Sequence, residues 1–206
     1  MSFEPTVFIV DDDAAFRESL ALLMLSMGLV SKTYASGDEF LRQFDETRPG
    51  CIILDVRMPQ QSGLAIQEKL TKFPNCPPII ILTGHAEVPV ALRALKQGAV
   101  EFLQKTFTEG ELREAVQRAI ALDAERRRTF ERRRHVTAKL DSLSRPEREV
   151  LQMVLAGHPN KKIASTLGIS QRAVEDRRAR VMKKLDADSL PELVRLAMEA
   201  GMKTEE

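Results

Sequence analysis

The chain has 206 residues, with 31 Lys and Arg against 30 Asp and Glu and a formal net charge of +1. No apolar run approaches the roughly 20 residues that span a bilayer, and no basic segment precedes an apolar one at the N-terminus. We therefore expect a cytoplasmic protein of one or two domains with no membrane partner. Residues 1–120 sum to −4, residues 121–142 to +3 and residues 143–206 to +2. This asymmetry predicts different partners for the two halves.

The first half alternates short β-rich runs with helical patterns, which is typical of a parallel sheet covered by helices on both faces. Phe16, Leu20, Leu23 and Met27 are spaced as one face of a helix. Similar patterns make five strand-helix units. The predicted strands are 7–10, 29–34, 51–54, 79–82 and 100–103, and the later helices are near 36–44, 63–72, 86–97 and 108–121.

Polar side chains stand where these strands end. Asp11 and Asp12 follow the first strand, Asp55 the third, Thr83 the fourth and Lys105 the fifth. A sheet of order 2-1-3-4-5 binds ligands at the carboxyl ends of its strands, between strands one and three. We expect all five side chains to meet in that crevice.

Three gathered carboxylates repel one another, which raises a pKa or recruits a cation. A hard divalent cation that prefers oxygen ligands, such as Mg²⁺, would offset the repulsion between the carboxylates. Aspartate is also a nucleophile toward phosphoryl groups. The crevice therefore predicts a Mg²⁺-dependent phosphoryl acceptor, with Asp55 as the acceptor and Lys105 offsetting the incoming negative charge.

Residues 122–142 lack Gly and Pro and are dense in helix formers, so the last helix of the first half is predicted to continue beyond the sheet. A seven-residue spacing joins Ala115, Leu122, Val136 and Leu143, but Thr129 interrupts it. We favour a solvated helical linker over a coiled coil.

The last 60 residues predict a compact helical module. Ser144 with Glu147, and Ser189 with Glu192, have capping-box spacing ahead of apolar runs. A short helix, 161–167, leads through a Gly-containing turn to a longer one, 171–185, with six basic residues. This arrangement predicts a helix-turn-helix.

At these motifs the chain resembles a known family. Residues 1–121 resemble a response-regulator receiver domain in "VDDD", "LDVRMPQQSG", "ILTGHAEVP" and "EFLQK", and 143–200 resemble the LuxR-type helix-turn-helix of the FixJ/NarL family. The resemblance implies an α/β receiver of the flavodoxin/CheY-like fold (1–121), a linker (122–142) and an all-α, four-helix DNA-binding domain (143–206).

Carried over residue by residue, the resemblance implies Asp55 as the phosphoacceptor. Asp11 and Asp12 would be the metal carboxylates, with Asp12 favoured as a direct ligand, and the backbone carbonyl of Arg57 would be the third protein ligand. The implied cofactor is Mg²⁺.

The resemblance also implies a switch. Thr83 would hydrogen-bond the phosphoryl group, Lys105 would pair with it, and Phe102 would change rotamer with the state of Thr83. One position departs from the family: Thr106 stands where a proline in a cis peptide is usual. Since a non-proline cis bond is costly, we expect a trans bond or a displaced loop.

The second helix of a helix-turn-helix docks in the major groove while flanking residues hold phosphates. We expect base contacts from Gln171, Arg172, Glu175, Asp176 and Ala179, and a core role for Val174, Val181 and Leu185. The predicted phosphate contacts are Lys161, Lys162, Arg177, Arg178, Lys183 and Lys184.

Two positions in "AVEDRR" depart from the family's usual "TVEVHR". Asp176 and Arg177 stand where a small apolar residue and a histidine are common. Asp176 can accept from a cytosine amino group, so we favour altered base preference over loss of DNA binding. The three histidines, at 85, 135 and 158, are expected to be structural or solvated.

The favoured function is a two-component response regulator. A sensor histidine kinase would phosphorylate Asp55, and the receiver would dimerise through the face of its fourth helix, fifth strand and fifth helix. The paired modules would bind double-stranded promoter DNA, and RNA polymerase is a further partner that the resemblance allows. No catalysis is expected beyond phosphoryl acceptance and slow self-dephosphorylation.

Two alternatives remain open at the level of sequence. The first is a regulator that binds DNA independently of phosphorylation, an alternative suggested by Thr106 in place of the usual proline. The second is a phosphatase or another small-molecule enzyme, although no second acid or histidine base lies at the strand ends and Asp55 has no carboxylate two residues on.

Overall fold

The computed structural model describes residues 4–84 and 88–202, and its contacts divide the chain into two compact units, residues 1–128 and 129–206. In the N-terminal unit a five-stranded parallel sheet has the order β2-β1-β3-β4-β5, which confirms the predicted topology. The strands are β1 (Thr6–Val10), β2 (Val30–Tyr34), β3 (Gly50–Asp55), β4 (Ile79–Thr83) and β5 (Glu101–Gln104).

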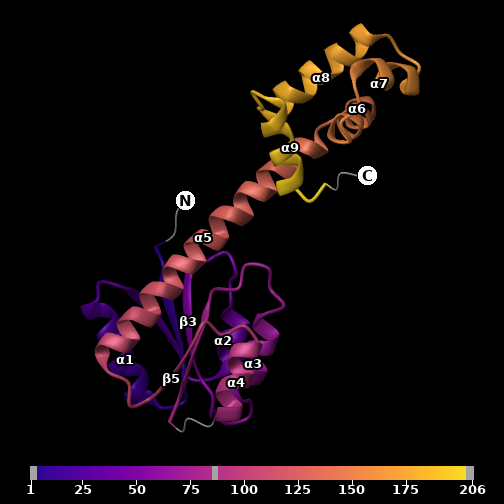
Figure 1. Cartoon of the computed structure of the whole chain (residues 1–206). Helices are drawn as coiled ribbons and strands as arrows, with labels where there is room; N and C mark the ends of the chain where they lie inside the picture. The colour runs from indigo at the N-terminus through magenta and orange to yellow at the C-terminus, as the bar shows by residue number, and fades with distance from the viewer. Residues whose placement is uncertain (1–3, 85–87, 203–206) are drawn as a thin grey trace. The chain divides into compact units, whose positions relative to one another are not determined.

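Helices cover both faces of this sheet (Figure 1). They are α1 (Ala14–Ser26), α2 (Gly37–Gln43), α3 (Gly63–Leu70), α4 (Val88–Lys96) and α5 (Glu109–Asp141). Successive strand residues point to opposite faces, so each apolar run supplies two cores. Phe8, Val10, Ile52 and Leu54 pack with α2, α3 and α4. The strand residues that alternate with them, including Val7, Ile9 and Ile53, pack with α1 and α5.

α5 is a single helix of 33 residues, as the lack of Gly and Pro in residues 122–142 predicted. Residues of the seven-residue stripe are buried within the two units. Ala115 belongs to the sheet core, and Val136 and Leu143 belong to the C-terminal core. Among the described residues, no helix is both long enough and apolar enough to cross a bilayer.

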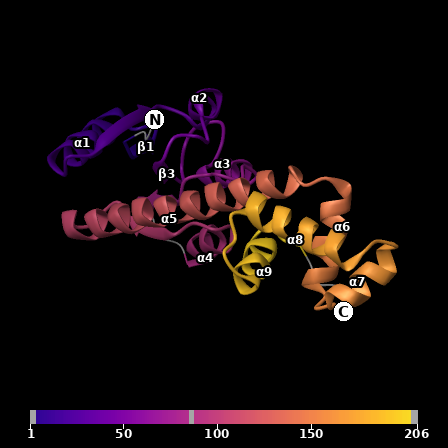
Figure 2. The ribbon, with the colours of Figure 1, turned by 90° about the horizontal axis from the view of Figure 1, so that it is seen from above.

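The C-terminal unit continues with α6 (Arg145–Leu155), α7 (Asn160–Leu167), α8 (Gln171–Leu185) and α9 (Leu190–Glu199). α6, α7 and α8 lie side by side (Figures 1 and 2). Gly168 ends α7 in the left-handed conformation, with φ of 64°, which a glycine adopts without a Cβ penalty. Ser170 then caps α8 by accepting from the Ala173 N–H. These two local signals make the turn of the helix-turn-helix.

Candidate functional site

The acidic crevice forms where β1 and β3 end. Carboxylate oxygens of Asp11, Asp12 and Asp55 lie within 4.8 Å of one another, with Asp11 and Asp55 buried and Asp12 exposed. Asp13 caps α1 by accepting from the N–H groups of Ala15 and Phe16, so the chain turns into the helix directly after the acidic pair. The fold therefore brings together three carboxylates that are up to 44 positions apart in the sequence.

Lys105 completes the crevice from the end of β5. Its Nζ lies 2.7 Å from Asp11 Oδ2 and 3.5 Å from Asp55 Oδ2. The Lys105 N–H donates to the Thr83 carbonyl at 2.7 Å, which continues the β4-β5 ladder past the strand ends. No cis peptide bond occurs in residues 4–84 or 88–202, so the bond to Thr106 is trans and Lys105 still reaches the carboxylates.

The charges of this crevice are coupled. Burial raises the pKa of Asp55 to about 6, the Asp11 carboxylate adds to the rise, and Lys105 and the N–H of Arg57 oppose it. Burial acts to lower the pKa of Lys105, but its hydrogen bond to Asp11 and the nearby negative charges outweigh burial and leave that pKa raised. Asp55 is thus mostly an ionised acceptor at pH 7, and Lys105 is an ammonium.

The donor set suits magnesium. This pocket presents three carboxylates with oxygen atoms close enough to share one ion. Oxygen ligands are the ones that Mg²⁺ prefers, and the ion keeps water positions that a phosphoryl oxygen can take. Lys105 already offsets part of the negative charge, but the exposed Asp12 has no ion pair among the described residues.

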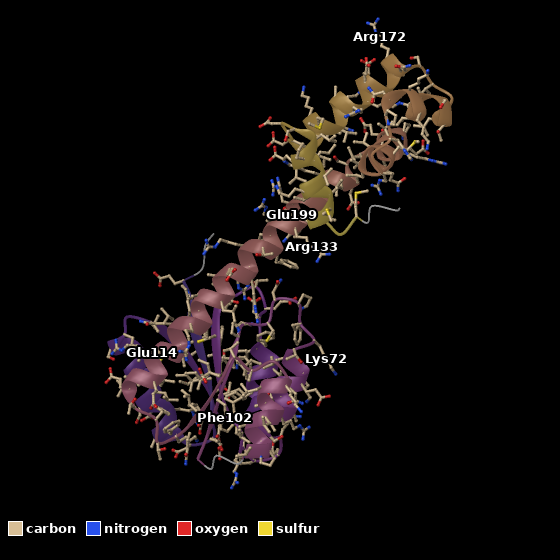
Figure 3. The ribbon with its side chains drawn as sticks, viewed as in Figure 1. Lys72, Phe102, Glu114, Arg133, Arg172 and Glu199 are labelled. Carbon is tan, nitrogen blue, oxygen red and sulfur yellow. The ribbon has the colours of Figure 1, made fainter. Side chains whose placement is uncertain are left out.

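The predicted switch residues lie next to this crevice. Thr83 is buried at the end of β4. Phe102 is half-buried on β5, where it pairs with Ile81 of β4, and Figure 3 labels its side chain in the N-terminal unit. Arg57 is exposed in the loop after β3, and its N–H contacts the Asp55 carboxylate. The structure shows where these residues lie, and their roles remain predictions.

The basic helix α8 has one buried and one exposed face. Val174, Val181 and Leu185 are buried in the core of the unit, as expected. With 100° between successive residues, Arg172, Asp176, Ala179 and Lys183 form the stripe opposite that core, and all four are exposed. Figure 3 shows Arg172 projecting from the start of α8 into solvent. The stripe holds three of the five predicted base contacts, Arg172, Asp176 and Ala179.

Two family models match the chain: "Response regulator receiver domain" over residues 7–117 and "Bacterial regulatory proteins, luxR family" over residues 141–197. This chain belongs to the response regulators. It is a DNA-binding transcription regulator of the two-component type, with a receiver and a LuxR-type helix-turn-helix. It belongs to a family of transcription factors rather than typical enzymes.

Similar response regulators match over nearly their whole length. The chain is 43% identical to the transcriptional regulatory protein FixJ of Azorhizobium caulinodans, over 95% of this chain and 93% of that protein. It is 39% identical to the response regulator protein TmoT of Ectopseudomonas mendocina, over 94% and 88%. The structure of the response regulator StyR, 40% identical, superposes with a TM-score of 0.86 and covers 95% and 99%.

In this response regulator the predicted DNA-contact residues differ in solvent exposure and in their hydrogen bonds to other side chains. Gln171, Glu175, Lys161, Lys162 and the stripe residues are exposed, whereas Arg177 is half-buried. Arg178 donates from Nη1 to Asn160 Oδ1 at 2.5 Å and so joins α8 to α7. Arg180, which the sequence-based set omitted, is exposed beside the stripe.

Lys184, a predicted phosphate contact, makes bonds inside the C-terminal unit. Its Nζ lies 2.7 Å from Glu147 Oε2 and 3.3 Å from the Ser142 carbonyl. The same buried carboxylate accepts from the N–H and the hydroxyl of Ser144, both at 2.8 Å. Glu147 therefore joins the start of α6 to the end of α8.

The Glu147 network predicts acid sensitivity of the C-terminal unit. The bond from Lys184, with those from Ser144, lowers the pKa of Glu147 to about 2. A depressed carboxyl pKa contributes stability that is present above the unfolded pKa of about 4.3 and is lost as pH falls toward 2. Because Lys184 is 39% exposed and solvent screens the pair, we expect Glu147→Gln to cost about 1–2 kcal/mol at pH 7.

The loss is measured as faster amide hydrogen exchange in α6 and α8 of the full chain at pH 7, converging with wild type near pH 2. Glu149→Gln is the matched control, because its partner Arg145 is 91% exposed and that pair is expected to contribute under about 0.5 kcal/mol. Equal exchange in the two variants would contradict the assignment.

Sequence patterns gave no sign of a second charged cluster, at the opposite edge of the sheet from the crevice. Asp123 is buried, and its Oδ2 accepts from the Gly50 N–H at 2.9 Å and from Arg127 Nε at 2.7 Å. The remaining guanidinium N–H groups donate to four backbone carbonyls. These are Glu46, Thr47, Arg48 and Asn75, at 2.7–3.2 Å. We call Asp123 and Arg127 the clasp, since they bind two loops to α5.

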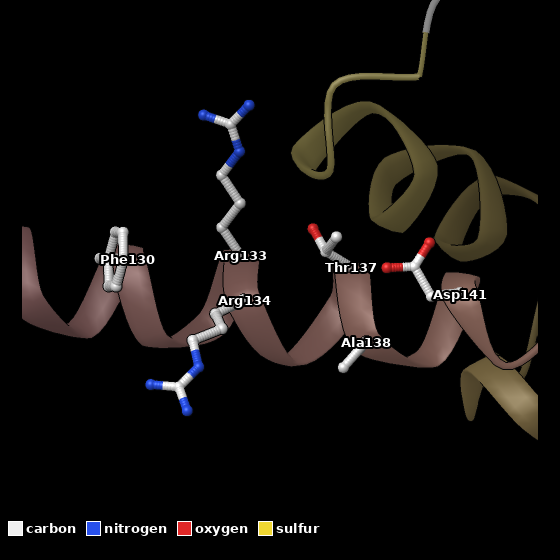
Figure 4. Close-up of a pocket in the computed structure, with 6 residues that line it drawn as sticks. All are labelled: Phe130, Arg133, Arg134, Thr137, Ala138 and Asp141. Carbon is white, nitrogen blue, oxygen red and sulfur yellow. The ribbon is translucent and has the colours of Figure 1, made fainter. Parts of the chain in front are cut away.

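A recess of about 380 Å³ runs along α5 in the C-terminal unit. Its six lining residues, from Phe130 to Asp141, all belong to that one helix, and Figure 4 shows Arg133 and Arg134 pointing in different directions. Because the two guanidinium groups do not converge on one point, the recess lacks the convergent polar groups that are typical of a ligand site. Of the histidines, His135 is exposed, His158 is half-buried and His85 lies outside the described residues.

Proposed function

We propose that a sensor histidine kinase phosphorylates this response regulator on Asp55 in a Mg²⁺-dependent reaction. Phosphorylation then favours a homodimer whose helix-turn-helix modules bind promoter DNA. The observation that carries the proposal is the convergence of Asp55, Asp11, Asp12 and Lys105 in one crevice. Asp11, Asp12, Asp55 and the backbone carbonyl of Arg57 would hold the ion.

The bound ion would neutralise negative charge on the phosphoryl oxygens. An Asp55 carboxylate oxygen attacks phosphorus, so an O–P bond forms while the N–P bond to the kinase histidine breaks and the leaving imidazole takes a proton. Lys105, 3.5 Å from the Asp55 oxygen, moves its ammonium onto the transferred group. The Thr83 hydroxyl donates to a second phosphoryl oxygen, and the side chain of Phe102 changes rotamer when Thr83 does so.

An exposed apolar stripe supports dimerisation through the α4-β5-α5 face. Val88, Leu92 and Leu95 of α4 are 71%, 53% and 46% exposed and follow helical spacing. Glu101 of β5 and Arg118 of α5 form an exposed ion pair on neighbouring elements. Apolar residues beside paired charges suit an isologous interface between two copies. Association with RNA polymerase would follow on promoter DNA.

The test compares wild type with Asp55→Ala in the full chain. We expect beryllofluoride with Mg²⁺ to convert wild type to a dimer in sedimentation and to raise its affinity for DNA selected from a random library at least tenfold. Asp55→Ala should show neither change, and Asp45→Ala, at an exposed and remote carboxylate, should behave as wild type.

Equal DNA affinity of wild type with and without beryllofluoride would reject phosphate control. It would favour the alternative in which DNA binding is independent of phosphate. The trans bond at Thr106 motivates that alternative, but Lys105 lies within 3.5 Å of the Asp55 and Asp11 carboxylates, which supports the first function.

A further inference from the structure

The ammonium of Lys105 has a third neighbour besides Asp11 and Asp55. Its Nζ lies over the ring of Phe16, 4.5 Å from the ring centroid. Phe16 is on the first turn of α1 and contacts Phe107 edge to face, with ring centroids 6.3 Å apart. The ring of Phe16 therefore contacts both the Lys105 ammonium and the ring of Phe107 in the loop after β5.

We propose that Phe16 is a positioning residue for phosphoryl transfer, holding the Lys105 ammonium beside Asp55 through its ring face. The inference rests on the proposed function of the same crevice. It assigns a role to a residue that helical spacing alone places in the core.

The chemistry of the ring explains why an aromatic residue suits this place. A cation within about 6 Å of a ring centroid is attracted by the ring quadrupole. That attraction uses none of the three N–H donors of the ammonium, so all three stay available for carboxylate and phosphoryl oxygens. Lys105 can then exchange Asp11 and Asp55 for an incoming phosphoryl group without leaving Phe16.

The sequence around Lys105 explains why such support matters here. Thr106 leaves the backbone freer than a proline, whose ring fixes φ, would leave it. The loop is held by the Lys105 N–H on Thr83, by the Phe107 N–H on the Gln104 carbonyl and by the ring contact with Phe16. Phe16 therefore supports both the backbone and the charged end of Lys105.

The test measures phosphorylation of the full chain by acetyl phosphate with saturating Mg²⁺. We expect Phe16→Leu to slow it about 3- to 10-fold, the fold-change that corresponds to a cation–π contact, with the Mg²⁺ affinity unchanged. Phe16→Tyr, which keeps the ring, should restore the rate. Phe44→Leu is the matched control, because Phe44 is a half-buried ring packed in the opposite core.

A double-mutant cycle decides whether Phe16 acts through Lys105. In a Lys105→Met background, Phe16→Leu should cause no further loss. An equal loss in both backgrounds, or a wild-type rate for Phe16→Leu, would overturn the proposal.

A second measurement stays decisive if Asp55 accepts no phosphoryl group. The ring current of Phe16 should shift the Cε protons of Lys105 upfield in NMR spectra, and Phe16→Leu should abolish that shift. Absence of the shift in wild type would refute the positioning role. If wild type shows the shift but takes up no more phosphate than Asp55→Ala, the contact between Phe16 and Lys105 stands and the proposed function is refuted.

Discussion

Arg127→Met will lower the free energy of unfolding of the N-terminal unit by about 3–5 kcal/mol. The substitution leaves the buried Asp123 carboxylate with the Gly50 N–H as its remaining hydrogen-bond donor among the described residues, and it removes donors from four loop carbonyls. A buried charge that loses its partner costs more than the pair contributes, because the remaining group cannot regain water.

Urea denaturation of the full chain measures this loss, and amide exchange in residues 45–49 and 75–78 locates it. Arg128→Met is the matched control, since Arg128 is the next residue of α5 and is exposed. Within residues 4–84 and 88–202 its guanidinium donates only to the Ala124 carbonyl of its own helix. A loss for Arg127→Met within about 1 kcal/mol of the control would show that the clasp contributes little.

Gly63→Ala is expected to cost about 3 kcal/mol of stability and to slow phosphorylation about 10- to 100-fold. A Cβ at Gly63 would lie 2.0 Å from the carbonyl oxygen of Asp55 and 3.2 Å from the Cα of Val56. Both are backbone atoms, and the Gly63 N–H already donates to the Val56 carbonyl at 2.9 Å. The phosphoacceptor itself must move to admit a methyl group.

Urea denaturation and acetyl phosphate kinetics measure the two effects in the full chain. Gly110→Ala is the control, because its Cβ would meet only the Thr108 hydroxyl at 3.9 Å and alanine favours the helix. A Gly63→Ala variant that matches wild type in both assays would show that the β3-α3 loop adapts without displacing Asp55.

The strands and the acidic crevice were predictable for a shared reason. Runs such as "CIIL" and "IIIL" are buried on both faces, so their apolar character is continuous and local. Parallel strands end at one edge, so Asp11 and Asp55 had to meet once the strand order was known. Capping-box spacing likewise predicted where α6 and α9 begin, and the structure confirms both starts, with Ser144 and Ser189 as the N-caps.

Other features depend on contacts that no local pattern marks. Asp123 and Arg127 have the spacing of an ordinary solvated pair on a helix, and their partners are mainly backbone groups about 50 to 80 positions away. Lys184 was predicted from its position on α8 to contact phosphate, and no local pattern indicated that its ammonium also pairs with Glu147. Phe16 fits an apolar stripe whether or not a lysine lies over its ring.

The sequence by itself determined the strands, the helices and the set of acidic side chains at the strand ends, because periodicity and strand polarity are local properties. The strand order was predicted from the resemblance to receiver domains. Only the tertiary structure decided which charged side chains are already partnered, as in the clasp and the Glu147 network, and which ring lies beneath the Lys105 ammonium. Those pairings depend on distances between distant segments, and packing alone sets such distances.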